Sequence, residues 1–274
     1  MLAVWRFKPK KLKQDKLKQK SATCFLSVVL LYCCSVLSVT ATANGVEDFR
    51  AALPLLKSST PIVLNAQFKL FGRSGEHDEL IEREGLINVR LEDGDGGLRA
   101  TYSPELIAQL HTEELAKIDD ENVKNSALNA VGQFEYWEWR EILYPAAQME
   151  LILGRYHFVS EKMDRFNGLP ARLLTFSMPK EKIDKSFRKY VKKYKNHFLV
   201  WIDANGVPLA SKITEKGSGR VFIVIGFSFK NEIHTEYRQH NGRLIAIKRE
   251  VNDESTGATM RSQRHFITTA SPIN

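Results

Sequence analysis

The chain has 274 residues, of which 43% are hydrophobic and 26% are charged, and its formal net charge of +8 corresponds to a pI of about 9.3. A pI this high is typical of nucleic-acid-binding proteins. The excess charge, however, is confined to residues 1–43, which hold eight basic side chains against the single acidic Asp15, so residues 44–274 are nearly neutral. We therefore expect no nucleic-acid partner.

Residues 1–43 have the pattern of a secretory signal peptide. A basic stretch precedes an apolar run over 22–39, and the small residues Ala41 and Ala43 follow at the two positions that a signal peptidase recognises. The pattern predicts export to the periplasm with cleavage after Ala43. The apolar run of 18 residues is also long enough to span a bilayer, so tethering by an uncleaved N-terminal anchor is the alternative.

The three cysteines, Cys24, Cys33 and Cys34, all lie in this segment. Residues 44–274 therefore contain no disulfide, no thiolate metal site and no cysteine nucleophile. Their number suits one large domain or two small ones, and no stretch rich in Pro, Gly or Ser divides them. We expect a single domain over 44–274.

The first part of this domain is predicted to be a helix followed by antiparallel strands. The spacing of apolar residues predicts a helix over 46–57. Alternation of apolar and polar residues predicts a strand over 61–70, a turn at 72–75, and two further strands around 87–91 and 98–102.

The middle of the chain has helical spacing. Pro104 is typical of a first helical turn, and apolar residues then recur with a 3.6-residue period as far as residue 118. A second helix is predicted over 122–143, with Phe134 and Trp137 on the apolar stripe that packs against the rest of the domain.

Strands are predicted to dominate the remainder. Segments 198–203 and 207–213 are two of them, and 221–237 alternates either as one long strand or as two joined near its middle. The lysine-rich segment 180–195 differs, because its apolar residues have helical spacing and predict an amphipathic helix.

The Asn-Gly pair at 241–242 predicts a hairpin turn. If one face of the hairpin is buried, Tyr237 should lie opposite Ile247, and Ile233 should lie opposite Val251. That register needs a loop with an odd number of residues, so a three-residue loop from Asn241 to Arg243 is expected. Together the elements predict an α+β fold, a curved antiparallel sheet or incomplete barrel with helices packed over one face.

One segment resembles a known family. Phe198, Trp201, Asp203, Gly206 and Leu209 form a hydrophobic–Trp–hydrophobic–Asp strand, a turn and a Gly-x-Pro-Leu strand start. This hairpin is similar to one in the lipoprotein-localisation (LolA/LolB-like) superfamily, which includes the periplasmic lipoprotein carrier and the N-terminal domain of the sigma-E regulator RseB. The resemblance implies an incomplete barrel closed by helices, with an apolar cavity for acyl chains.

Aromatic residues are the candidate ligand-binding residues. Apolar pockets are lined mainly by aromatic and aliphatic side chains. The candidates for the cavity wall are Phe134, Trp137, Trp201, Phe227 and Phe229. The alternative for the aromatic-rich helix is that it is simply buried on two sides, with Trp139 away from the main apolar stripe.

No pattern of catalytic or metal-binding residues is present. The chain lacks a G-x-S-x-G motif, a P-loop and a dinucleotide fingerprint after a strand. Its seven histidines show no metal-ligand spacing. We therefore expect no enzyme activity, no metal and no cofactor.

The segment 180–195 holds eight basic residues and two acidic ones. A solvated surface is the simple interpretation of such a charge run. The alternative is a contact with an anionic membrane surface or an acidic partner, because basic residues are attracted to anionic lipid headgroups.

The interpretation that these observations favour is a periplasmic binding protein that holds a lipid, an acylated protein or another hydrophobic ligand between sheet and helices. The alternative is an envelope protein-interaction or stress-sensing module that transports no ligand.

Overall fold

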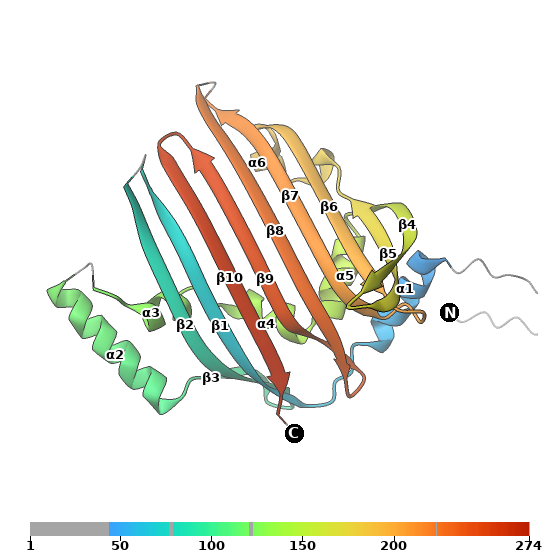
Figure 1. Ribbon diagram of the computed structural model, residues 1–274, viewed down its shortest axis with the longest axis horizontal. Coiled ribbons are helices and arrows are strands. Elements are labelled where there is room, and N and C mark those ends of the chain that lie inside the picture. The colour runs from blue at the N-terminus through green and yellow to red at the C-terminus, as the bar shows by residue number, and fades with distance from the viewer. Residues whose placement is uncertain (1–43, 77–78, 121–122, 223, 274) are drawn as a thin grey trace, which may run out of the picture. The chain divides into compact units, whose positions relative to one another are not determined.

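The alternating segments of the sequence form one antiparallel sheet, seen along its full width in Figure 1. The computed structural model describes residues 44–76, 79–120, 123–222 and 224–273. The predicted signal segment 1–43 lies outside the described residues, so export, cleavage and anchoring stay predictions. The strands are β1 (Ile62–Glu76), β2 (Glu79–Gly94), β3 (Gly97–Thr101), β4 (His157–Phe166), β5 (Leu169–Ser177), β6 (Val191–Ile202), β7 (Pro208–Val221), β8 (Ile225–His240), β9 (Arg243–Gly257) and β10 (Met260–Pro272).

The ten strands have the order β3-β2-β1-β10-β9-β8-β7-β6-β5-β4. The last strand pairs with the first, because β10 lies antiparallel to β1 from Leu64 opposite Pro272 to Glu76 opposite Met260. The sheet is curved and open, with β3 and β4 as its two edges. The predicted class, α+β with a curved antiparallel sheet that does not close into a barrel, is confirmed.

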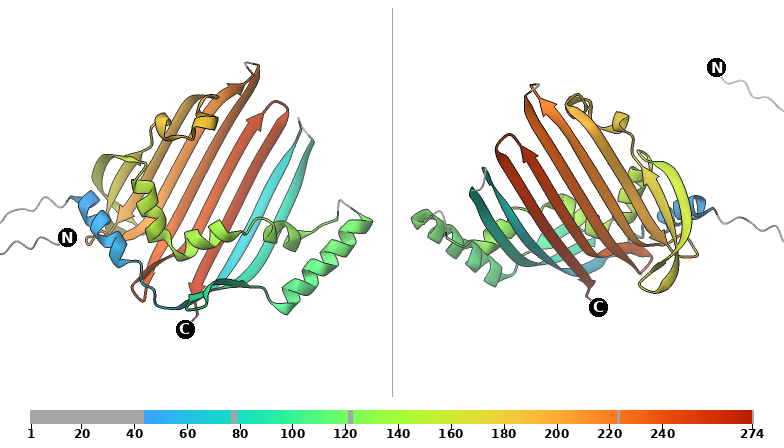
Figure 2. Two further views of the ribbon diagram at one scale, coloured as in Figure 1. Left: turned by 180° about the vertical axis from the view of Figure 1, so that it is seen from behind. Right: turned by 45° about the horizontal axis from the view of Figure 1, so that its top comes forward.

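The helices lie on one face of this sheet (Figure 2). They are α1 (Gly45–Leu55), α2 (Pro104–Asp119), α3 (Ser126–Val131), α4 (Tyr136–Leu143), α5 (Pro145–Leu153) and α6 (Lys185–Arg188), with a 3₁₀ turn η1 (Lys180–Lys182). The segment from α2 to α5 crosses that face from the β3 edge to the β4 edge. Packing of helices over one face is therefore confirmed as well.

The core lies between these helices and the sheet and forms two clusters. In the first, Phe68 of β1 and Phe134, which follows α3, are buried with their ring centroids 5.1 Å apart. In the second, Phe49 of α1 packs near Phe176 and Phe198 of β5 and β6. Burial of such side chains stabilises a fold by about 1.5–3 kcal/mol each.

The helix predicted over 122–143 is divided, and this prediction was wrong in its continuity. A break at residues 132–135 separates α3 from α4 and changes the direction in which the α4 side chains point. Trp139 consequently packs against the first cluster and donates its Nε1–H to the carbonyl of Phe134 at 3.2 Å. Trp137, which was predicted to face the core, is 60% exposed.

The predicted helix at 180–195 is also wrong. Only η1 and α6 are helical there, and β6 begins at Val191, opposite Gly219 of β7. Strand pairing therefore overrides the helical spacing of the apolar residues. Similarly, the predicted turn at 72–75 lies inside β1, and 221–237 is divided because β7 ends at Val221, whereas β8 is continuous from Ile225 to His240.

The register of the β8–β9 hairpin is partly as predicted. Ile233 does lie opposite Val251, but Tyr237 lies opposite Ala246 instead of Ile247. The turn has two residues, and the extra residue is accommodated by a β-bulge at Glu236 and Tyr237. The even-sum register that the parity argument requires therefore holds only beyond the bulge, from Glu236 opposite Lys248, and the pairing predicted for Tyr237 was wrong.

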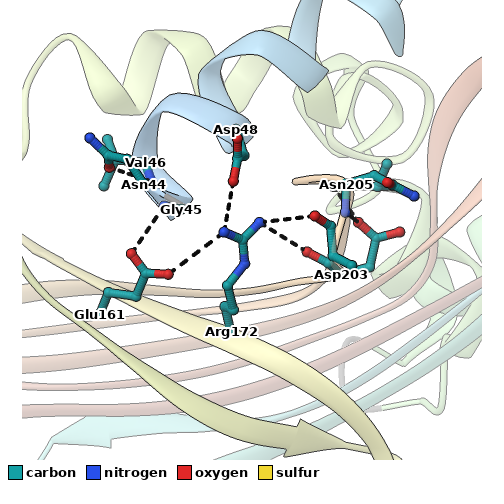
Figure 3. A network of polar contacts seen from close by, with 10 residues as sticks. Asn44, Gly45, Val46, Asp48, Glu161, Arg172, Asp203 and Asn205 are labelled. Atoms are coloured by element: carbon teal, nitrogen blue, oxygen red, sulfur yellow. Dashed lines mark hydrogen bonds and ion pairs between the residues drawn. The ribbon is translucent and has the colours of Figure 1, made fainter. Parts of the chain in front are cut away.

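A buried arginine fixes α1 to the sheet (Figure 3). Nη1 of Arg172 on β5 lies 2.7 Å from Oδ2 of Asp48 and 3.8 Å from Oε1 of Glu161. Its Nη2 donates to the carbonyl of Ala204 at 3.2 Å. Glu161 in turn accepts the backbone N–H of Gly45 at 3.0 Å, which satisfies a free donor at the helix start.

The Trp-x-Asp-x-x-Gly hairpin has a role in the same contact. Oδ1 of Asp203 accepts the N–H groups of Asn205 and Val207, each at 2.8 Å, and so shapes the β6–β7 turn. Gly206 adopts φ +82° and lies against the backbone of Asp48, where a Cβ would overlap. The hairpin motif therefore positions α1, a structural role.

Replacing Arg172 should destabilise the domain strongly. An Arg172→Met substitution removes the ion pairs of the half-buried carboxylates of Asp48 and Glu161 and the hydrogen bond to the carbonyl of Ala204, and we expect a loss of about 2 kcal/mol in the free energy of unfolding, measured by urea denaturation. The matched control is Arg99→Met, because Arg99 makes an exposed ion pair with Glu92 at 3.9 Å, worth less than about 1 kcal/mol. Equal effects of the two substitutions would contradict this role for Arg172.

Candidate functional site

The helices cover only part of the face on which they lie. They cross the strands as one band, and towards the tips of the β1–β2, β9–β10 and β7–β8 hairpins α6 is the one helix of the described residues on this face (Figure 2). Along β9, Val251 is buried, whereas Asp253 and Ser255 on the same face are half-buried and exposed. We call this uncovered part the open sheet surface. Its residues are Glu215, Gly217, Gly219, Phe227, Phe229, Asn231, Asp253, Ser255, Ser262 and Arg264.

Three phenylalanine rings gather on this surface and form what we call the aromatic shelf, Phe187, Phe227 and Phe229. The ring of Phe187, on α6, has its centroid 5.7 Å from that of Phe227 and 5.8 Å from that of Phe229. The two β8 rings lie nearly parallel, at 11° and 6.4 Å. Phe187 is 40% exposed, and the other two are half-buried, so the shelf is accessible to a ligand.

Two glycines make room for the shelf. Gly217 and Gly219 of β7 lie opposite Phe229 and Phe227 in the strand register. A Cβ at either position would overlap the ring opposite it, so the rings lie over the bare backbone of β7. Glycine inside a strand often marks such a close approach.

A row of polar side chains borders the shelf on β6 and β7. The hydroxyl of Tyr156 donates to Oδ1 of Asn196 at 2.7 Å, and Nδ2 of Asn196 donates to the Tyr194 hydroxyl at 3.0 Å. The Tyr194 hydroxyl donates to Oε1 of Glu215 at 2.6 Å. Burial raises the pKa of Tyr156 to about 12, and burial together with the bond to Glu215 raises the pKa of Tyr194 far above its ordinary value. Both phenols therefore stay neutral donors.

A cavity of about 370 Å³ lies between α3 and the strands β1, β2 and β10. Its lining includes Arg83 and Arg264 together with the side-chain amides of Asn129 and Gln133. Arg264 also pairs with Asp253, with Nε 3.1 Å from Oδ2. These groups are hydrogen-bond donors, and they suit a polar or anionic group.

A third polar cluster lies beneath α4, inside the covered part of the face. Nη1 of Arg249 lies 2.7 Å from Oε2 of Glu138, and both side chains are nearly buried. Burial raises the pKa of the neighbouring Glu141, against the opposing effect of Arg249. The Tyr237 hydroxyl, whose pKa burial raises to about 12, is 2.6 Å from the Ser211 hydroxyl. The cluster fastens α4 to the sheet.

The five predicted wall residues are not brought together. Phe227 and Phe229 lie side by side on the open sheet surface, but Phe134 fills the core beneath the helices and Trp137 points away from it. Trp201 is on the opposite face, since its neighbours Val200 and Ile202 are buried in the second cluster. A ligand-binding role for any of the five stays a prediction.

The surroundings of Trp201 indicate a structural role. Its Nε1–H donates to Oδ2 of Asp164 at 3.1 Å, and its ring lies 6.2 Å from that of Phe166 and 6.5 Å from that of His234. On the same outer face, further along the sheet, polar residues including Asn65, Gln67 and Arg90 line a groove of about 630 Å³.

Sequence reasoning missed Phe187, because its segment was predicted as one long helix. The pair Gly217 and Gly219, two residues apart in the polar last third of β7, is a signal for the other two rings of the shelf rather than for Phe187. Glycines in that arrangement predict that large side chains of the next strand lie over them, and Phe229 and Phe227 are those side chains.

Among residues 44–76, 79–120, 123–222 and 224–273, no three or more His, Cys, Asp or Glu side chains are grouped as metal ligands would be. No helix in the described part of the chain is both long and apolar enough to cross a membrane.

Neither a protein-family model nor a curated protein matches the sequence. Two solved structures are similar over most of the chain. The first is a DUF1329 family protein from Desulfovibrio piger, with a TM-score of 0.30, 8% identity, and coverage of 82% of this chain and 91% of that chain. The second is MucB in complex with MucA(peri), with a TM-score of 0.25, 9% identity, and coverage of 83% and 93%. At these TM-scores no conclusion about family, ligand or partner follows, and the LolA/LolB-like resemblance stays a prediction.

The raised pKa of Glu141 predicts a pH-dependent stability. A carboxyl group whose pKa is higher in the folded state stabilises the fold only while it is protonated, and its ionisation destabilises the fold as pH rises through the folded pKa. We therefore expect Glu141→Gln to unfold at higher urea concentration than the wild type at pH 7, with the advantage shrinking as pH falls towards about 4, where unfolded glutamate is also protonated.

The control for this experiment is Glu114→Gln, at an exposed position on α2. It should give the same difference from the wild type at both pH values. A Glu141→Gln protein that is less stable than the wild type at pH 7 would show instead that attraction to Arg249 outweighs the effect of burial.

Proposed function

We propose that this chain is an exported binding protein that holds an apolar chain, such as the acyl chain of a lipid or of an acylated protein, on the open sheet surface. The observation that carries the proposal is the aromatic shelf. Large apolar patches are rarely left accessible on soluble proteins unless they bind something. Here three rings from α6 and β8 are kept together and accessible, over two glycines that leave the space for them.

The proposed place differs from the enclosed cavity expected from the sequence. In the described part of the chain, side chains of the domain itself, among them Phe134, Leu143 and Met149, fill the space under the helices and are almost fully buried. An acyl chain would have to displace α4 or α5 to enter there. On the open sheet surface it gains about 25 cal/mol per Å² of buried apolar area without that cost.

The polar groups beside the shelf suit an amphipathic ligand. The neutral hydroxyls of Tyr156 and Tyr194 border it on one side, and across the open sheet surface Arg83 and Arg264 line the cavity under α3. Ligand sites typically combine an apolar lining with a few polar groups that fix orientation. A lipid fits this arrangement, with its acyl chain on the shelf and its headgroup near the arginines.

A protein-interaction module is the second candidate, and one observation favours it. The edge strand β4 has an unpaired side and exposes Val159 and Met163. An extended peptide adds to such an edge through backbone hydrogen bonds. Both candidates are binding functions, and we propose binding rather than catalysis as the work of the domain.

Native mass spectrometry of the protein purified gently from its own cell envelope separates the two candidates. A lipid-sized mass that remains bound supports the first proposal. A co-purified protein with no lipid supports the second and overturns the first. The N-terminal mass measured in the same spectrum tests export, since cleavage after Ala43 leaves a chain that begins at Asn44.

Substitutions on the shelf should weaken ligand binding without unfolding the domain. We expect Phe229→Ser to bind an apolar fluorescent probe, anilinonaphthalene sulfonate, about tenfold more weakly, because much of the contact area of one ring is lost. Phe187→Ala should have a smaller effect in the same direction. Circular dichroism checks that both variants remain folded.

Trp137→Ala is the matched control, since Trp137 is an exposed aromatic residue on α4, away from the shelf. Its probe affinity should equal that of the wild type. Loss of affinity in Trp137→Ala, with Phe229→Ser unaffected, would move the binding site from the sheet to α4.

A further inference from the structure

The turn between β7 and β8 exposes large apolar side chains. Phe222 is 79% exposed, Val224 is 81% exposed, and Ile225 follows them at the start of β8. We call these three residues the apolar tip. The other hairpin turns whose residues are described carry small or polar residues, namely Asp95-Gly96, Asn167-Gly168, Ala204-Asn205, Asn241-Gly242 and Ala258-Thr259.

The backbone conformation at Phe222 is one that large side chains rarely adopt. Phe222 has φ +50°, in the left-handed region, and its carbonyl accepts the N–H of Val224 at 2.7 Å. Asn167 and Asn241 have the same φ in their turns, and asparagine tolerates this region well. A bulky residue is strained there, so Phe222 is unfavourable both for the backbone and for its exposure to water.

Basic residues surround the apolar tip. Arg220 is next to the end of β7, and its N–H donates to the carbonyl of Tyr190 at 3.1 Å, which places the part of the lysine-rich segment around Tyr190 beside the tip. Further along, Lys195 lies opposite Lys216, which lies opposite Lys230. The remaining basic residues on α6 and at the start of β6 are Lys185, Arg188, Lys189, Lys192 and Lys193.

The row formed by Lys195, Lys216 and Lys230 is unfavourable in isolation, because like charges directly opposite each other destabilise a sheet. Two carboxylates offset part of this repulsion, because Nζ of Lys230 lies 3.7 Å from Oε1 of Glu254, and Lys216 and Lys230 help to lower the pKa of Glu232, which pairs mainly with Lys212. An anionic surface next to these strands would offset the repulsion.

We propose that the apolar tip inserts into the headgroup layer of an anionic phospholipid bilayer while the surrounding lysines and arginines contact the lipid phosphates. Stable attachment to a membrane surface generally needs two weak signals together, an apolar insertion and a basic patch. The structure supplies both at one end of β6, β7 and β8. The proposal is independent of the ligand site, because changes at the tip leave the aromatic shelf in place.

The first test is binding to protein-free vesicles, using the protein as recovered from the envelope of cells that express the whole chain. Vesicles of phosphatidylcholine with phosphatidylglycerol are compared with vesicles of phosphatidylcholine alone in a flotation assay. We expect binding to the anionic vesicles that weakens with added salt. Equal binding to both kinds of vesicle, or to neither, overturns the proposal.

The decisive variant is Phe222→Asn, because it should change stability and membrane binding in different directions. Asparagine accepts the left-handed backbone, so the melting temperature should not fall, whereas vesicle binding should weaken about tenfold through loss of the inserted ring. The matched control is Ile118→Asn on α2, since Ile118 is likewise 79% exposed and belongs to a different edge of the domain. Its vesicle binding should not change.

Charge removal tests the second half of the proposal. Lys193→Gln and Lys216→Gln should each weaken binding to anionic vesicles about fivefold, the expectation for one basic residue at a charged membrane surface. Lys117→Gln on α2 is the matched control and should have no effect. If all three variants bind alike, the basic residues around the tip are not in contact with lipid.

A depth measurement reports on the tip even if another segment also holds the protein on the vesicle. Phe222→Trp adds one indole at the tip, and brominated lipids should quench its fluorescence beyond the quenching seen in the wild type. No additional quenching overturns insertion. Concentration-dependent oligomers that disappear in Phe222→Asn, without vesicle binding, would identify a second copy of the chain as the occupant and also overturn the proposal.

Discussion

The path of the chain from one edge of the sheet to the other determines what the rest of the molecule can do. β3 and β4 are consecutive strands in the sequence, yet they form opposite edges of a ten-stranded sheet. Nine spacings of about 4.8 Å separate them, or about 43 Å, and the connecting segment crosses this width as α2 to α5. A helix is about 10 Å across, whereas a strand of 15 residues is about 50 Å long. One crossing therefore covers only a band, and the open sheet surface is the part left over.

The single crossing of the helices also determines which residues of this face hold the fold together and which are left accessible. Where the band crosses, Arg249 and Glu138 fasten α4, and Arg172 fastens α1, so the covered half is held by charges as well as by the two apolar clusters. Beyond the band, α6 is the one helix of the described residues that lies on this face. The aromatic shelf and the apolar tip both lie in this second region, at the ends of β7 and β8 that the band from α2 to α5 does not cover.

Much of the fold could be predicted from the sequence, because period-two alternation is strong wherever one face of a strand is buried. The α+β class, the start of the first mid-chain helix at Pro104 and the pairing of Ile233 with Val251 are such cases. The failures have local causes. The apolar residues of 180–195 have helical spacing, and only pairing with β7 makes the part from Val191 onwards a strand. Because of the break before α4, Trp139 packs against the core in place of Trp137. No local sequence pattern indicates this break. The shelf depends on Phe187 and on two glycines that are distant from it in the sequence, so of its three rings only Phe227 and Phe229 are among the residues predicted from the sequence.

Pairing of β1 with β10 has a consequence for how the domain is made. The first core cluster includes residues of β1, β2 and α3, but also Ala270 and Phe266 from the last strand. Contacts between such distant segments form late and slowly, because the long intervening loop must close first. The N-terminal half thus cannot complete its core while the ribosome is still adding the C-terminal residues. A chain with this topology stays incompletely folded until its synthesis is finished. An unfolded chain is also the form that passes most easily through a narrow translocation channel.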